Sequence, residues 1–93
     1  MKVYGQATIA KFSKKHAASR KPLQRFLEIV RQAGWLHFAD VKNTFGSADY
    51  VSGRLVFDLG GNKYRVVASV DFHEQIFVVD RVMTHEEYGR ENF

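Results

Sequence analysis

The chain has 93 residues, a net charge of +4 and no cysteine. This length suits one small domain that folds around its own core, and the missing cysteine excludes disulfides, thiol nucleophiles and cysteine-ligated metal sites. No apolar run reaches the ~18 residues of a membrane span, and the N-terminus lacks the apolar core of a signal peptide, so we expect a cytoplasmic protein without membrane contact.

The charge is unevenly distributed along the chain. Residues 1–39 contain eight Lys or Arg residues and one acid, Glu28, whereas residues 40–93 contain six basic and nine acidic residues. A cationic N-terminal half can attract RNA or an acidic protein partner. A solvated helix surface explains the same charge equally well, because basic composition is a weak sign of nucleic-acid binding.

The N-terminal half predicts a short strand and two helices. Residues 1–3 suit the strand, and apolar residues three apart in a Lys-rich stretch ending at His16 indicate an amphipathic helix. Pro22 suits the first position of a second helix and Gly34 its stop. The apolar residues of that second helix follow helical spacing: Leu23, Phe26, Leu27 and Val30.

The middle segment, residues 35–53, is irregular. Its sequence, WLHFADVKNTFGSADYVSG, mixes aromatic residues with Gly, Ser, Asn and Asp. We expect a long loop held down by its aromatics, with Trp35, Phe38 and Phe45 packed beneath it in preference to stacking on nucleic-acid bases.

The remainder predicts a meander of three antiparallel strands and a short helix. RLVFDL at 54–59, KYRVVASVDF at 63–72 and IFVVDRVM at 76–83 are the strands, and GGN at 60–62 signals a tight turn. The fold class is therefore α+β: two N-terminal helices packed on a small antiparallel sheet, followed by a short C-terminal helix, in one domain spanning residues 1–93.

The C-terminal helix has a recognisable start. In THEEYGR, residues 84–90, Thr84 and Glu87 have the spacing of a capping box. His85 would be the first helical residue, and Tyr88, three positions on, would project from the same side. This places both side chains beside a helix N-terminus, which attracts anions.

Strand alternation predicts a cationic surface near that helix. With Tyr64 and Val66 facing the helices, Lys63 and Arg65 would emerge together on the opposite face. On the next strand Asp80 and Arg81 would point to opposite faces, with Arg81 just upstream of His85.

Convergence of these residues would suit metal-independent cleavage of RNA. The ribose 2′-hydroxyl attacks the adjacent phosphate, a base removes its proton, cations stabilise the added charge, and an acid protonates the leaving oxygen. Each residue also has an ordinary explanation: Lys63 and Arg65 as solvated edge charges, Arg81 as a partner for nearby acids, His85 as an exposed residue, Tyr88 as a hydrophobic anchor and Asn62 as a turn residue.

Other chemistries have no support in the sequence. The four histidines lack metal-ligand spacing. GGN is not followed by the Lys-Ser/Thr of a phosphate loop, and no Gly-x-Ser-x-Gly sequence occurs.

Two segments, VFDLGGNKYRVVASVDF and RVMTHEEYGR, resemble the HigB-type toxins of bacterial type II toxin-antitoxin pairs, which are small mRNA interferases with a RelE-like fold. The most specific parts are GGNKYR at 60–65 and THEEY at 84–88. The resemblance implies a ribosome-associated mRNA endoribonuclease that uses no cofactor and no metal. It also implies a HigA-type antitoxin with a helix-turn-helix domain, which alone would bring the toxin to operator DNA.

The resemblance places the site by position. It implies a site at Asn62, Lys63, Arg65, Arg81, His85 and Tyr88. We expect Arg65 and Arg81 to bind phosphate, Lys63 to bind phosphate or the 2′-hydroxyl, His85 to transfer a proton and Tyr88 to orient the substrate, with Asn62 contributing to RNA binding. The family commonly has Asp after the tyrosine, where this chain has Gly89.

Two alternatives stay open at this point. The chain could be a noncatalytic module that binds RNA or an antitoxin, with the basic half gripping the partner. It could also be an inactive toxin remnant that still binds an antitoxin, and Gly89 is the residue that raises this alternative.

Overall fold

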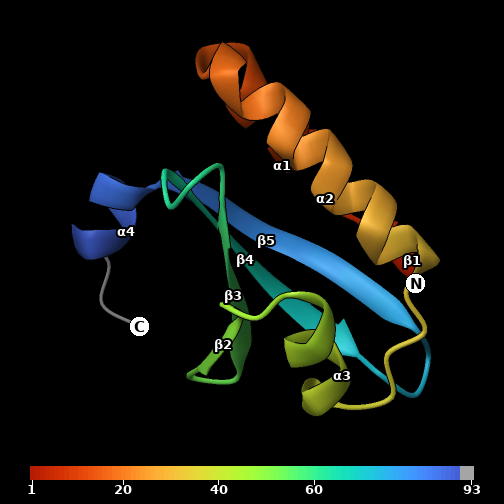
Figure 1. Cartoon of the computed structure of the whole chain (residues 1–93). Coiled ribbons are helices and arrows are strands. Elements are labelled where there is room, and N and C mark those ends of the chain that lie inside the picture. Colours follow the sequence, from red (N-terminus) through yellow and green to blue (C-terminus); the bar gives the residue numbers. More distant parts are fainter. Residues whose placement is uncertain (91–93) are drawn as a thin grey trace.

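The computed structural model describes residues 1–90 and confirms an α+β fold, with a five-stranded sheet in the order β1-β5-β4-β3-β2. Helices α1 and α2 lie together on one side of the sheet, and α4 lies at one end of it (Figure 1). The elements are β1 (Lys2–Tyr4), α1 (Gln6–Lys15), a 3-10 turn (Ala17–Ser19), α2 (Arg20–Gln32), α3 (Phe38–Thr44), β2 (Asp49–Val51), β3 (Arg54–Leu59), β4 (Tyr64–Asp71), β5 (Ile76–Thr84) and α4 (His85–Arg90).

Both N-terminal helices follow the predicted pattern, with shifted ends. The helix α2 buries its four regularly spaced apolar residues, begins two residues before Pro22 and ends at Gln32, before Gly34. The backbone N–H groups of the first helical turn have no acceptor within the helix. Pro22, which has no N–H, is therefore tolerated there. The main core joins these helices to β3, β4 and β5, with the rings of Phe26, Phe57 and Phe77 in mutual contact.

The sheet is larger than the predicted small antiparallel sheet, and it is mixed. The strands β2, β3, β4 and β5 pair antiparallel, whereas β1 pairs parallel with β5, with Lys2 opposite Ile76. The predicted long loop was also wrong, because it contains α3 and β2. These two elements have seven and three residues, too few to show a clear period in the sequence.

The packing beneath the middle segment was predicted correctly. Trp35 is buried and packs against Phe45 and Phe77, while Phe38 is partly buried against Tyr50.

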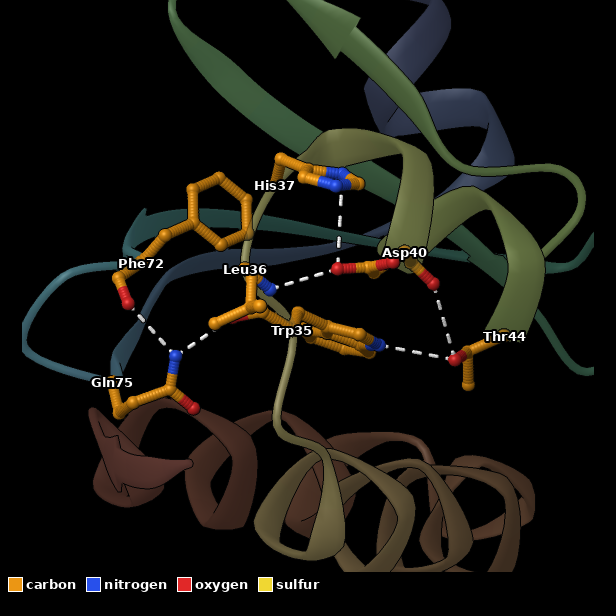
Figure 2. A network of polar contacts seen from close by, with 7 residues as sticks. All are labelled: Trp35, Leu36, His37, Asp40, Thr44, Phe72 and Gln75. Atoms are coloured by element: carbon orange, nitrogen blue, oxygen red, sulfur yellow. Dashed lines mark hydrogen bonds and ion pairs between the residues drawn. The ribbon is translucent and has the colours of Figure 1, made fainter.

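A polar network fixes this segment to the β4–β5 turn (Figure 2). The Trp35 indole N–H donates to Thr44 Oγ1 at 3.0 Å, and the Leu36 amide donates to Asp40 Oδ2 at 2.9 Å. From the turn, Gln75 Nε2 donates to the Trp35 carbonyl at 2.7 Å. The bonds of the Trp35 indole and of Gln75 are partly buried, so they satisfy polar groups that would otherwise be costly to bury.

The two faces of the sheet differ. One face packs on the main core, and the other, which we call the open face, carries a small cluster of Val56, Val67 and Met83. Among residues 1–90, no helix has the length and apolar character needed to cross a membrane.

Candidate active site

The β3–β4 turn and the start of α4 meet at one end of the sheet. Leu59 pairs with Tyr64, so residues 60–63 form the turn. Asn62 has a positive φ of 75°, a conformation that asparagine tolerates better than most residues. The backbone amide of His85 donates to the Lys63 carbonyl at 2.8 Å, which fastens α4 to the turn.

The capping box is confirmed. The Thr84 amide donates to Glu87 Oε1 at 2.9 Å, and the Glu87 amide donates to Thr84 Oγ1 at 3.1 Å. The hydrogen bond from the Thr84 backbone lowers the pKa of Glu87 below its ordinary value of 4.5. Because the cap orients the first turn, it also directs His85 and Tyr88.

Arg65 is the centre of the site. Its Nε lies 2.8 Å from Asp58 Oδ1, and its Nη2 lies 2.8 Å from Asn62 Oδ1 and 2.9 Å from His85 Nδ1. The ring of Tyr88 lies 5.5 Å from the guanidinium carbon, within the range of a cation–π contact. One buried cation therefore joins the turn, two strands and α4.

The structure brings five of the six predicted site residues together. These are Asn62, Lys63, Arg65, His85 and Tyr88. The interpretation of Arg65 as a solvated edge charge was wrong, since the residue is only 6% exposed. Lys63 precedes the strand and is exposed, and it borders a shallow pocket of about 390 Å³ with Asn62, Thr84, His85 and Glu86.

Arg81 lies farther along the open face. The predicted opposition of Asp80 and Arg81 was wrong, because a β-bulge interrupts the register between β4 and β5. Arg81 pairs with Val67 on the open face, and Asp80 accepts a hydrogen bond there from Ser69 Oγ at 2.6 Å. An extra residue in one strand puts two neighbours on one face. Arg81 is therefore a diagonal neighbour of Arg65, for which a spacing of about 7–8 Å is usual.

Sequence reasoning missed Asp58. It lies directly across the hairpin from Arg65. The signal was present, because a four-residue turn at 60–63 pairs 59 with 64 and 58 with 65. The prediction instead counted only GGN as the turn and considered no carboxylate of β3.

The arrangement offers charge and hydrogen bonding at the edge of a shallow pocket. Lys63 and Arg81 are exposed, and His85 carries an imidazole held from one side by Arg65. Such a set suits an anionic substrate whose charge increases during reaction. Within residues 1–90, no group of three or more His, Cys, Asp or Glu side chains is arranged to hold a metal ion.

Comparisons with known proteins all find similarity to HigB-type toxins. The profile of a protein family described as HigB_toxin, the RelE-like toxic component of a toxin-antitoxin system, matches residues 19–91. A 51-residue stretch is 45% identical to the mRNA interferase toxin HigB of Escherichia coli K12, covering 52% of this chain and 49% of that protein. The mRNA interferase HigB of Shigella flexneri gives the same values. The mRNA interferase HigB of Escherichia coli O6:H1 is 23% identical over 97% of this chain and 90% of that protein.

Proposed function

This chain belongs to the HigB family of RelE-like toxins, and we propose that it is the toxin of a type II toxin-antitoxin pair that inhibits translation by cutting mRNA. The aligned stretch spans about half the length of two of the relatives named above, at 49%, and those relatives are named mRNA interferases. Their activity supports the proposal, and the site geometry supplies the chemical argument.

One observation carries the proposal. Arg65 and His85 lie 20 residues apart in sequence, and their side-chain nitrogens are 2.9 Å apart. They belong to the two segments that most resemble the family. A contact between a guanidinium and an imidazole, beside an exposed lysine and at a pocket edge, has the composition of a site for an anion that reacts.

The proposed reaction uses the RNA as its own nucleophile. The 2′-oxygen attacks phosphorus and the bond to the 5′-oxygen breaks, which leaves a 2′,3′-cyclic phosphate and a 5′-hydroxyl. Water takes the proton of the 2′-hydroxyl and supplies a proton to the leaving oxygen, so the step balances, and we propose that it uses no metal. Lys63 and Arg81 would neutralise the charge of the phosphate. His85 would contact the phosphate group that is attacked, and Tyr88 would orient the substrate.

The partners follow from the same proposal. The chain would act on mRNA at the ribosome in the cytoplasm, and a HigA-type helix-turn-helix antitoxin would neutralise it. Operator DNA would be reached only through the antitoxin complex. The cationic residues of α1 and α2 are exposed, which would favour a polyanionic or acidic partner.

The test is to map cellular mRNA 5′ ends after a short pulse of expression in bacteria. We expect new ends that disappear in His85→Ala and when translation is blocked. A folded wild-type chain that produces no new ends would contradict the nuclease and favour a noncatalytic binding module. Ends that persist during the translation block would contradict the ribosome requirement alone.

A further inference from the structure

Arg65 has no N–H group left for a substrate. A guanidinium has five N–H donors, and five acceptors surround this one. In addition to Asp58, Asn62 Oδ1 and His85, the backbone oxygens of Asn62 and Tyr64 lie 3.2 and 3.3 Å from Nη1. Its side chain is only 8% exposed. A phosphate would have to displace one of these partners to bond Arg65. The guanidinium therefore orients neighbouring groups of the protein, His85 among them, and does not bind the substrate.

The contact with His85 determines which ring nitrogen carries hydrogen. A guanidinium can donate a hydrogen bond but cannot accept one, so His85 Nδ1 must be the acceptor. A neutral imidazole with an acceptor at Nδ1 carries its hydrogen on Nε2. Since His85 is exposed and borders the pocket with Lys63, the ring offers an N–H donor rather than a lone pair to a bound substrate.

Asp58 holds the guanidinium in place. The hairpin register sets Asp58 opposite Arg65, and its carboxylate contacts Nε at 2.8 Å. Because the two residues are backbone neighbours across β3 and β4, this contact depends on sheet geometry rather than on a flexible loop. The Tyr88 ring lies against the same guanidinium and limits its movement further.

We propose that Asp58 and Arg65 are positioning residues, which keep neutral His85 in its Nε2–H form so that it acts on RNA as a hydrogen-bond donor. The action of His85 on RNA rests on the proposed function. Negative charge grows on the nonbridging phosphate oxygens as the 2′-oxygen attacks, and a fixed donor stabilises it. In this role His85 keeps its Nε2 hydrogen throughout the reaction. Hydrogen-bond donation therefore replaces the proton transfer that the sequence led us to expect of His85.

The first test is independent of activity. Nitrogen-15 NMR of the whole chain, labelled at histidine, is recorded at mildly alkaline pH, where histidine is ordinarily neutral. We expect His85 to carry hydrogen on Nε2 and to show an Nδ1 resonance shifted by an accepted hydrogen bond. Arg65→Met should move Nδ1 to the position of an unbonded nitrogen, and Asp58→Asn should move it part of the way.

The controls are internal to the molecule. His16, His37 and His73 should keep their signals in each variant. Asp80→Asn removes another partly buried carboxylate of the open face, which contacts Arg54 and Ser69, and should leave His85 unchanged. Hydrogen on Nδ1 in the wild type would overturn the proposal without any variant, as would an Nδ1 resonance that Arg65→Met leaves in place.

The second test separates hydrogen-bond donation from proton transfer. A glutamine amide can donate from about the position of Nε2, but it cannot relay a proton. We expect His85→Ala to lower kcat by about 100- to 1000-fold, as removal of a transition-state donor does, and His85→Gln to recover at least tenfold of that loss. Asp58→Asn should lower kcat without raising KM, because Lys63 still binds phosphate.

The outcomes are distinct. Equal losses in His85→Gln and His85→Ala would overturn the donor role. A wild-type chain that cuts no RNA in the presence of ribosomes would overturn the proposed function, whereas the NMR result decides the positioning role of Asp58 and Arg65 by itself.

Discussion

Thr84 and Glu87 each accept a hydrogen bond from the other's backbone amide at the start of α4. Thr84→Ala removes one of these bonds, and loss of such a cap typically costs about 1 kcal/mol. We expect the opening free energy of α4, measured by amide hydrogen exchange, to fall by that amount. Thr84→Ser keeps the hydroxyl and should stay close to the wild type. Equal exchange in the serine and alanine variants would contradict the cap.

The same pair predicts a pH dependence of α4. The Thr84 amide lowers the pKa of Glu87 below its ordinary value. A carboxyl with a lowered folded pKa stabilises the fold above its unfolded pKa, and the stabilisation disappears as pH falls through the folded value. We expect constant protection of α4 at neutral pH and a loss in the acidic range. Glu87→Gln should remove that difference, and an identical acid profile would contradict the assignment.

Gly5 predicts a strong backbone effect. Its φ is 86°, and a Cβ placed there would lie 2.5 Å from the Val79 carbonyl oxygen. The left-handed conformation alone costs a nonglycine residue about 1–2 kcal/mol, and the clash adds to this. We expect Gly5→Ala to lower the free energy of unfolding by at least that amount in denaturant titration.

Gly46→Ala is the matched control for Gly5. A Cβ at this position would have no atom within 4 Å outside the neighbouring residues, and Gly46 is not among the residues with positive φ. The control should leave stability close to the wild type. Similar losses for both substitutions would show that the approach of Gly5 to β5 is not the cause.

Lys63 is expected to contact phosphate directly. Lys63→Gln should weaken RNA binding for all sequences alike and reduce the slope of log affinity against log salt by about 1. Lys2→Gln removes an exposed cation of β1 that pairs with Ile76, at the end of β5 opposite to Thr84, and should leave both affinity and slope unchanged. An unchanged salt slope in Lys63→Gln would contradict the phosphate contact.

The sequence predicted the elements whose pattern is long and local. The apolar spacing of α2, the alternation of β3, β4 and β5, and the Thr84–Glu87 cap were all confirmed. The short elements α3 and β2 and the parallel pairing of β1 were missed. Their positions depend on contacts far along the chain, such as Lys2 with Ile76, which periodicity does not encode.

The sequence predicted which residues would gather at this end of the sheet for five of six positions, but it did not predict the geometry of their contacts. Alternation correctly put Arg65 on the face opposite Val66, but it could not show that Asp58 and His85 would enclose the guanidinium. The bulge at Asp80 adds one residue to β5, so that Asp80 lies on the open face together with Arg81. The sequence could not predict this, because strand register depends on the pairing partner as well as on the sequence.

The position of β5 has a consequence for how the protein is made. This strand pairs with both β1 and β4 and leads directly into α4, so it is synthesised after the two strands that it joins. During translation, β1 must wait for a partner more than 70 residues downstream, and Arg65 must wait for His85. A nascent chain that lacks β5 and α4 therefore cannot bring Arg65 and His85 together, so the candidate site forms only after synthesis has passed residue 85.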